Sequence, residues 1–344
     1  MTLGRIAFLG SGETSLAGGR IFDSLARLIP DPLRVAIMET PAGFELNSAV
    51  VASRVGDFLQ TRLQNYKPVI DVIPARKLGT EFSPDDPDIL TPLLRANFIF
   101  MGPGSPTYAI RQLKGTLAWD IIRARHRLGA TLVFASAATI SVSAWALPVY
   151  EIYKVGEDVF AKEGLNLFRD FGLHLSFIPH WNNAEGGAEL DTSRCFVGMD
   201  RFVEWCNLVP SENTTIGLDE HTGLILDLEA GKCEVSGISS VSLVRDCNPE
   251  MYPSGVKFLL SELGEFKMPE PLSLGISDKA WDMVSNLIPV ENDKPSDAVL
   301  LLLEQRQQAR ARKDFSESDH LRDVIAAHGW TVQDSKEGQK LVKL

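Results

Sequence analysis

The chain has 344 residues, of which 44% are hydrophobic and 23% are charged, a composition that is ordinary for a soluble globular protein. No apolar run reaches the roughly 18 to 20 residues that would span a bilayer, so we expect no membrane contact. The net charge is −11. Residues 295–344 carry eight basic and eight acidic side chains, so the whole deficit lies in residues 1–294, which argues against broad nucleic-acid binding there.

The first part of the chain alternates apolar runs with amphipathic segments. Strands buried on both faces are expected at residues 6–10, 34–39, 69–74, 98–101 and 131–134. Helices with a 3.6-residue apolar period are expected between them, at residues 21–28, 49–63, 108–113 and 119–128. This alternation predicts an α/β fold with a mostly parallel sheet and helices on both faces.

The start of the chain and the cysteines bear on the cellular location of the protein. Residues 1–10 run into a Gly-rich loop without a small-residue cleavage site, so we interpret them as the first strand and not as a signal peptide. The four cysteines show no CxxC spacing, which favours free buried thiols over a disulfide framework or a zinc site. We therefore expect a cytoplasmic protein, and we expect neither a metal nor a cofactor.

The pattern changes after residue 220. Short strand-like runs at 224–227, 233–236 and 241–244, with a hairpin turn at 229–232, predict an antiparallel extension on the sheet edge. A proline-containing linker with one short helix near 280–287 is expected next. Helices at 296–313 and 316–327, then a strand at 330–334, predict a small C-terminal helical hairpin with short strands. The expected division is a main domain at 1–265, a linker at 266–294 and a C-terminal domain at 295–344.

Ser136 is the first candidate catalytic residue. It directly follows the apolar run 130–135 and precedes a stretch of good helix formers, with alanine at positions 135, 137 and 138. A serine on a sharp turn between strand and helix, flanked by small residues, is typical of a nucleophile elbow. A plain junction between a strand and a helix stays open as the alternative.

His180 and Glu220 each follow an apolar strand-like run, at 175–178 and 214–219. Because the carboxyl ends of strands line the ligand crevice of an open α/β sheet, both side chains are expected to lie near Ser136. A histidine can take the proton of a serine hydroxyl, and a carboxylate can hold that histidine in the required tautomer. Asp219 is a local alternative to Glu220.

Together these motifs resemble the peptidase E and cyanophycinase family of serine peptidases, which share the class I glutamine amidotransferase-like fold. The family patterns are G-x-S-A-G, N-P-H-x-x-N and G-L-x-E, and this chain matches them in order at Ser136-Ala137, at Pro179-His180 with Asn183, and at residues 217–220. The similarity covers roughly residues 4–245. The resemblance implies a serine hydrolase that cleaves a peptide or amide bond through an acyl-enzyme.

The resemblance also implies roles for individual residues. Ser136 would be the nucleophile, His180 the general base and then acid, and Glu220 the group that orients the histidine. The backbone N–H groups of Ala137 and of Gly104, in a Gly-rich turn, would bind the oxyanion. The residues expected at the substrate are Gly12, Ser105 and Asn183.

Two departures leave a second function open. Phe134 and Ala138 replace both glycines of the elbow pattern. The chain could therefore be a non-catalytic member that acts as a binding module. Peptidase E cleaves dipeptides that begin with aspartate, and cyanophycinase cleaves a polymer of aspartate and arginine. We assign neither specificity to this chain, because its pocket residues cannot be matched to those of the family.

The C-terminal segment resembles the C-terminal domain of cysteinyl-tRNA synthetases, whose pattern is R-x-x-A-R-x-x-K-D-F-x-x-A-D-x-I-R-D. The match runs over residues 306–323, while the catalytic signatures of the synthetases are absent from the main body. This resemblance implies tRNA contacts by Arg306, Arg310 and Lys313, whose spacings of four and three share one helix face. A purely structural role or a homodimer contact stays open.

Overall fold

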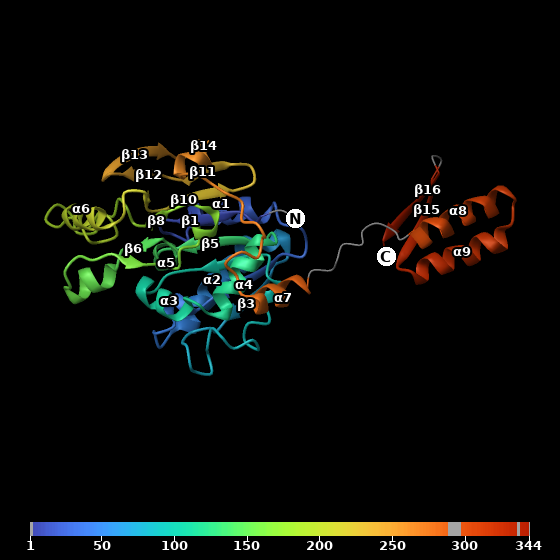
Figure 1. The fold of residues 1–344 in the computed structure, drawn as a ribbon, viewed down its shortest axis with the longest axis horizontal. Coiled ribbons are helices and arrows are strands. Elements are labelled where there is room, and N and C mark those ends of the chain that lie inside the picture. Colours follow the sequence, from blue (N-terminus) through green and yellow to red (C-terminus); the bar gives the residue numbers. More distant parts are fainter. Residues whose placement is uncertain (1–2, 288–296, 336–337, 344) are drawn as a thin grey trace. The chain divides into compact units, whose positions relative to one another are not determined.

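The computed structural model describes residues 3–287, 297–335 and 338–343. The chain folds into two compact units, Met1–Ser285 and Asn286–Leu344 (Figure 1). Within the expected linker at 266–294, the helix α7 (Asp278–Ser285) packs against α4 (Leu117–Arg127) in the first unit. The remainder of that linker, from residue 288 onward, lies outside the described residues.

The main sheet of the first unit has eight strands in the order β14-β11-β10-β1-β5-β4-β2-β3. Its parallel part comprises β1 (Ile6–Leu9), β5 (Thr131–Ala135), β4 (Phe98–Met101), β2 (Arg34–Met38) and β3 (Val69–Ile73). Apolar side chains of α1 (Leu16–Ala26) and α2 (Ser48–Arg62) pack on one face, and those of α3 (Pro106–Leu113) and α4 pack on the other. The predicted α/β class with helices on both faces is confirmed.

The antiparallel extension is also present, joined to the free edge of β1. It comprises β10 (Thr222–Asp227), β11 (Lys232–Gly237) and β14 (Lys257–Leu259). The run at 241–244, which we expected in this extension, instead belongs to a second sheet, in β12 (Ser240–Arg245). That assignment was wrong, because the short turn after β11 carries the chain out of the main sheet.

The second sheet has four strands in the order β13-β12-β9-β8. Its strands β8 (Leu175–Ile178) and β9 (Thr214–Leu218) are parallel, while β12 and β13 (Asn248–Pro253) continue it antiparallel. The chain therefore carries His180 and Glu220 on a sheet different from the one that carries Ser136. The sequence pattern did not predict this second sheet.

Shorter elements complete the first unit. They are α5 (Ala137–Ser141), α6 (Met199–Leu208), β6 (Trp145–Ala146), β7 (Lys162–Glu163) and a π-helical turn, η4 (Glu151–Val155). Of the helices in the described parts of the chain, none combines the length and the apolar character that crossing a membrane requires.

A group of stacked aromatic rings joins the two sheets. The ring centroid of Phe8 on β1 lies 5.6 Å from that of Phe134 on β5 and 3.9 Å from that of Phe177 on β8. All three side chains are fully buried. Such ring pairs contribute about 0.5–1.5 kcal/mol each beyond the area they bury. This packing fixes the second sheet against the main sheet next to the ends of β5 and β8.

The second unit contains α8 (Asp297–Ala311), α9 (Phe315–Ala327) and the hairpin β15 (Trp330–Ser335) and β16 (Gly338–Lys343). A small core of Val299, Ile325 and Val332 holds these elements together. The predicted helical hairpin with short strands is confirmed. The first helix ends at Ala311, two residues earlier than expected, because Asp314 caps the N-terminus of α9 by accepting a hydrogen bond from the Glu317 N–H.

We predict that Gly217→Ala destabilises the first unit. A Cβ atom at this position in β9 would lie 2.3 Å from Cδ2 of Trp181, a buried ring that follows His180 directly. The expected loss is about 1–3 kcal/mol of unfolding free energy, measured by urea denaturation. Gly56→Ala is the matched control, since a Cβ there makes only ordinary contacts of 3.6 and 3.7 Å, and equal stability of the two variants would contradict the prediction.

Candidate active site

Ser136 lies on a sharp turn between β5 and α5. Its backbone has φ 52° and ψ −117°, a conformation that costs energy for any residue with a side chain. Its hydroxyl does not cap α5. Phe134, which replaces a glycine of the family pattern, is buried beneath the turn in the aromatic stack, and Ala138 is fully buried. Both departures are thus accommodated inside the core.

His180 stands at the junction of the two sheets, directly after β8. The His180 backbone N–H donates to the Gly10 carbonyl across 3.1 Å. The Cys195 N–H donates to the His180 carbonyl, also across 3.1 Å. Its Nε2 atom lies 3.2 Å from Oγ of Ser136. The ring centroid of Phe196 lies 5.5 Å from that of His180. The imidazole is therefore held from its backbone and from one face of its ring.

Glu220 lies on the other side of the imidazole. Its Oε1 atom is 3.0 Å from Nδ1 of His180 and accepts a second hydrogen bond, also 3.0 Å, from Nδ2 of Asn183. Its backbone N–H donates to Oδ1 of Asn182 across 2.8 Å. Partial burial acts to raise the pKa of Glu220, but the hydrogen bonds from Asn183 and His180 outweigh it, so that the pKa is lowered.

The alternative acid, Asp219, points elsewhere. Its carboxylate accepts hydrogen bonds from the hydroxyls of Ser239 and Ser240, 2.6 and 2.9 Å long, and from the Ser240 N–H. Successive residues at the end of a strand project to opposite sides, so one of the two acids meets the histidine and the other ties down the next turn. Of the two acids, Glu220 is the one whose carboxylate contacts His180.

The order of these groups defines what they can do. When Nδ1 of His180 carries a proton and donates a hydrogen bond to Glu220, Nε2 is free to accept the proton of the Ser136 hydroxyl. The carboxylate then stabilises the imidazolium that results. The arrangement can activate a serine for attack on a carbonyl carbon.

The two backbone N–H groups expected to bind an oxyanion belong to Ala137, directly after Ser136, and to Gly104, in the turn after β4. Within the described part of the chain, neither Ala137 N–H nor Gly104 N–H donates to a backbone or side-chain acceptor. The Ala138 N–H donates to the Gly102 carbonyl across 3.2 Å and so holds the Gly-rich turn against the start of α5. Gly104 has φ 146°, and a Cβ there would lie 1.9 Å from the Pro41 oxygen, so the turn requires glycine at this position.

The residues expected to bind substrate have other contacts in the structure. Asn183 is 3% exposed and bonds the Glu220 carboxylate, so it positions the acid. Ser105 is buried, and its hydroxyl caps α3 by accepting from the Tyr108 N–H across 3.2 Å. Gly12 has φ 72°, and a Cβ there would lie 2.3 Å from the His221 ring. Glycine at this position therefore lets the loop after β1 pass close to that ring.

The three basic residues singled out in the C-terminal unit differ in exposure. Arg306 is 1% exposed and forms two hydrogen bonds with Asp334, 3.0 and 3.1 Å long, so its guanidinium is not available to a phosphate. Arg310 also bonds Asp334, across 2.5 Å, but its side chain stays partly exposed. Lys313 is exposed and lies in the turn after α8, at φ 63°, and not on the helix face we expected.

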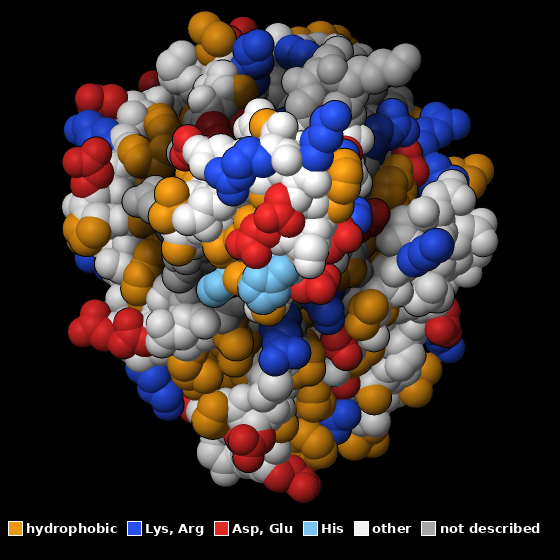
Figure 2. Space-filling view, turned by 90° about the vertical axis from the view of Figure 1, so that its right-hand side faces the viewer, with side chains coloured by type: hydrophobic (Ala, Val, Ile, Leu, Met, Phe, Trp, Pro, Cys, Tyr) orange, Lys and Arg blue, Asp and Glu red, His pale blue; other side chains and the backbone are white. Residues whose placement is uncertain are grey.

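Charges of both signs are mixed on one face of the molecule (Figure 2). On the face that Figure 2 draws, acidic and basic side chains are interspersed among polar and apolar ones. Any phosphate contact by the C-terminal unit would therefore depend on a few individual cations. Within the described residues, no group of three or more His, Cys, Asp or Glu side chains is arranged to hold a metal ion.

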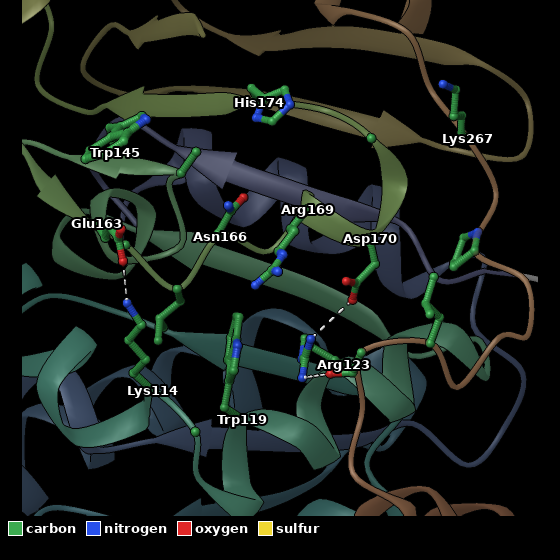
Figure 3. Close-up of a pocket in the computed structure, with 18 of the residues that line it drawn as sticks. Lys114, Trp119, Arg123, Trp145, Glu163, Asn166, Arg169, Asp170, His174 and Lys267 are labelled. Carbon is green, nitrogen blue, oxygen red and sulfur yellow. Dashed lines mark hydrogen bonds and ion pairs between the residues drawn. The ribbon is translucent and has the colours of Figure 1, made fainter. Parts of the chain in front are cut away.

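A large hollow of the first unit lies apart from Ser136. It measures about 1060 Å³, and its lining includes His174, Trp119 and Arg123 (Figure 3). His174 precedes β8 whereas His180 follows it, and six residues of extended chain span roughly 20 Å. Arg123 is already paired with Asp120 and Asp170. Lys114, elsewhere in the lining, is paired with Glu163. The hollow is therefore not part of the Ser136 site.

The C-terminal unit is similar to one domain of cysteine–tRNA ligases. The model of the cysteinyl-tRNA ligase anticodon-binding domain family matches residues 294–340. Cysteine–tRNA ligase 1 of Burkholderia lata is 40% identical over 76 residues, which make up 21% of this chain and 16% of that protein. The ligase of Chlamydia trachomatis serovar A is 41% identical over 63 residues, 18% of this chain and 13% of that protein. The chain thus spans less than a fifth of the length of either ligase.

The first unit has the fold of a peptidase. The crystal structure of a peptidase from an acI-B1 Actinobacterium is similar with a TM-score of 0.58 and 20% identity, covering 75% of this chain and 97% of that one. A putative peptidase E protein from Listeria monocytogenes EGD-e aligns over 73% of this chain and 98% of its own, with 15% identity and a TM-score of 0.42. The expected resemblance of the C-terminal segment to a cysteinyl-tRNA synthetase domain is confirmed, and the first unit shares its fold with a solved peptidase.

Some residues around the site had no signal in the sequence. Phe196 contacts the His180 ring, and Tyr153 on η4 contacts Phe196, with centroids 5.7 Å apart. Phe196 lies in no periodic apolar run and in no motif that we could match, whereas Tyr153 belongs to the polar segment 151–158, whose composition is compatible with a pocket wall or with a solvated helix end. Asn182, one residue before Asn183, could have been noticed only as part of the segment that follows His180.

We predict that the stability lost in Asn183→Ala depends on pH. The pKa of Glu220 is lower in the folded state than the unfolded-state pKa of about 4.3. The stabilisation from its ionised form is therefore complete above the unfolded-state pKa and is lost as pH falls through the folded-state pKa. The variant is expected to lose about 1–3 kcal/mol at pH 7, measured by urea denaturation, and less below pH ~4.

Asn182→Ala is the matched control, since Asn182 accepts from the Glu220 backbone and not from its carboxylate. Its loss of stability is expected to stay the same across this pH range. A loss for Asn183→Ala that is equally large at pH 7 and below pH ~4 would show that the carboxylate is not involved.

Proposed function

We propose that this protein is a serine hydrolase that cleaves a peptide or amide bond, with Ser136 as the nucleophile. The observation that carries the proposal is the continuous chain of hydrogen bonds from Ser136 Oγ to His180 Nε2 and from His180 Nδ1 to Glu220 Oε1. The strained backbone of Ser136 supports it, because such strain persists mainly at functional sites.

The reaction would follow the course of other serine hydrolases. His180 takes the proton of the Ser136 hydroxyl as Oγ bonds to the substrate carbonyl carbon, and Glu220 stabilises the imidazolium. The N–H groups of Ala137 and Gly104 bind the oxyanion. His180 then gives its proton to the departing amine, which leaves an ester on Ser136. A water molecule, deprotonated by His180, hydrolyses that ester and restores the serine.

We assign this chemistry to residues 1–265 and a separate role to residues 295–344. The runner-up for the first domain is a non-catalytic binding module, which the altered elbow at Phe134 and Ala138 suggested. The burial of both side chains below the turn supports the catalytic alternative over the binding module.

We predict that Ser136→Ala abolishes covalent labelling by a fluorophosphonate probe, which reacts with activated serines. Hydrolysis of peptide and amide substrates is expected to fall by on the order of 10⁴-fold or more, because the nucleophile is lost. Ser53→Ala, which removes an exposed hydroxyl of α2, serves as the control and should label like the unmodified protein. Equal labelling of the unmodified protein and Ser136→Ala would leave the binding-module alternative.

We further propose that residues 295–344 bind tRNA. The match of residues 294–340 to an anticodon-binding domain favours this role, and Arg310 and Lys313 are the exposed cations of the original three. Because two cations form a small footprint and the rest of the chain is acidic, binding is expected to be weak and strongly dependent on salt.

The full chain is predicted to retain tRNA in electrophoretic shifts at low ionic strength and to lose that retention when Arg310 and Lys313 are both replaced by alanine. Lys257→Ala, an exposed charge change in the first unit, is the control and should retain tRNA. Circular dichroism of the double variant reports whether the C-terminal unit still folds. Failure of the unmodified chain to retain tRNA would leave a purely structural role for the tail.

A further inference from the structure

Large apolar side chains are exposed on four segments whose neighbours contact His180, the Gly-rich turn or the residue after Glu220. A folded chain normally covers such groups, and where they gather around a cleft they mark a binding surface. We call this set the apolar rim and define it by its members, which come from four separate segments: Leu16, Phe44, Leu46, Tyr153 and Ile238.

The first side of the rim adjoins the histidine. Phe196 lies against the His180 ring, and the Tyr153 ring lies against Phe196, at centroid distances of 5.5 and 5.7 Å. Tyr153 is 41% exposed, so its other surface is free to meet a ligand. A substrate bound at Ser136 would extend along this aromatic pair.

The second side adjoins the Gly-rich turn. The Ser105 N–H donates to the Pro41 carbonyl across 2.9 Å, which ties that turn to the segment that follows β2. Three residues further on, the Phe44 ring lies 5.2 Å from the Tyr108 ring at the start of α3. Phe44 is 49% exposed, and Leu46 is fully exposed. The Gly-rich turn of the proposed oxyanion hole is thus bordered by a segment with two exposed apolar side chains.

The third side adjoins Glu220. The ring of the next residue, His221, touches Gly12, and its carbonyl accepts a hydrogen bond from the Ile238 N–H across 3.2 Å. Ile238 and Leu16, which follows the loop that contains Gly12, are both mostly exposed. The acid side of the site therefore has exposed aliphatic side chains as well.

The basic side chains near the site are already engaged. Arg194 lies over the Trp181 ring at 3.9 Å and donates to the Trp181 carbonyl, and Lys154 lies over the Tyr150 ring at 4.4 Å. Arg76, whose carbonyl accepts from Tyr108, pairs with a buried glutamate. An acidic substrate side chain would compete with the buried glutamate for Arg76, whereas an apolar side chain would bury surface on the rim.

We propose that the Ser136 site takes peptides or amides with an apolar side chain next to the bond that is cleaved, and that the apolar rim binds that side chain. This inference rests on the proposed hydrolase function and names its substrate class. It separates this chain from enzymes that select an aspartate at that position.

The test compares peptide p-nitroanilides that differ in one residue next to the cleaved bond, phenylalanine, leucine, aspartate or lysine, with free and with acetylated amino termini. The phenylalanine and leucine substrates are expected to have kcat/KM values at least roughly tenfold above the other two. Phe44→Ser and Tyr153→Ser are expected to remove most of this preference, mainly through KM.

Leu28→Ser is the matched control. It removes an exposed leucine that follows α1, at the opposite end of that helix from Leu16, and should leave the preference unchanged. A higher kcat/KM for the aspartate or lysine substrate, or an equal loss for all four substrates in the rim variants, would overturn the inference.

A binding measurement keeps this test separate from that of the proposed hydrolysis. The Ser136→Ala chain is titrated calorimetrically with the phenylalanine peptide and with the aspartate peptide. Tighter binding of the phenylalanine peptide, weakened at least tenfold by Phe44→Ser, supports the rim even when no hydrolysis is found. Labelled and active protein that binds both peptides equally would leave the hydrolase standing and reject the rim.

Discussion

The hydrogen bond from the His180 N–H to the Gly10 carbonyl joins the two sheets at the point where the candidate site forms. A second backbone bond, from the Trp181 N–H to the Leu218 carbonyl, is 3.0 Å long and holds the next residue to the strand that precedes Glu220. These two bonds fix the imidazole between a serine of one sheet and a carboxylate of the other. His180 has φ 50°, and the surrounding contacts keep it in that strained conformation.

The core beneath this junction explains why the altered elbow still forms the turn. Phe134 would be out of place beside Ser136 if its ring faced the cleft. It instead points into the stack with Phe8, where β1 and β5 pair in register. A close-packed aromatic core has low compressibility, so it keeps the spacing of Ser136, His180 and Glu220 nearly fixed.

The C-terminal unit shows that one sequence pattern can serve two purposes. Arg306 and Arg310 belong to the same motif and are one helical turn apart. Arg306 is buried against Asp334, where removal of either partner would leave an uncompensated charge, while Arg310 shares that carboxylate and still reaches the surface. The motif therefore contains both a residue that is buried in the fold and residues whose side chains reach the surface.

The sequence by itself predicted the parallel strands of the main sheet and the helices that cover them. It also singled out Ser136 and His180 as candidates, with Glu220 and Asp219 as alternative acids, because each is marked by a local pattern of apolar runs and their ends. Only the tertiary structure shows that Glu220, and not Asp219, contacts His180 and that Asn183 bonds the Glu220 carboxylate. It also shows that Arg306 is buried and that β8, β9 and β12 belong to a second sheet. It also gathered the apolar rim from four segments. These outcomes depend on contacts between residues far apart in the chain, and apolar periodicity records which side of a strand is buried but not what it is buried against.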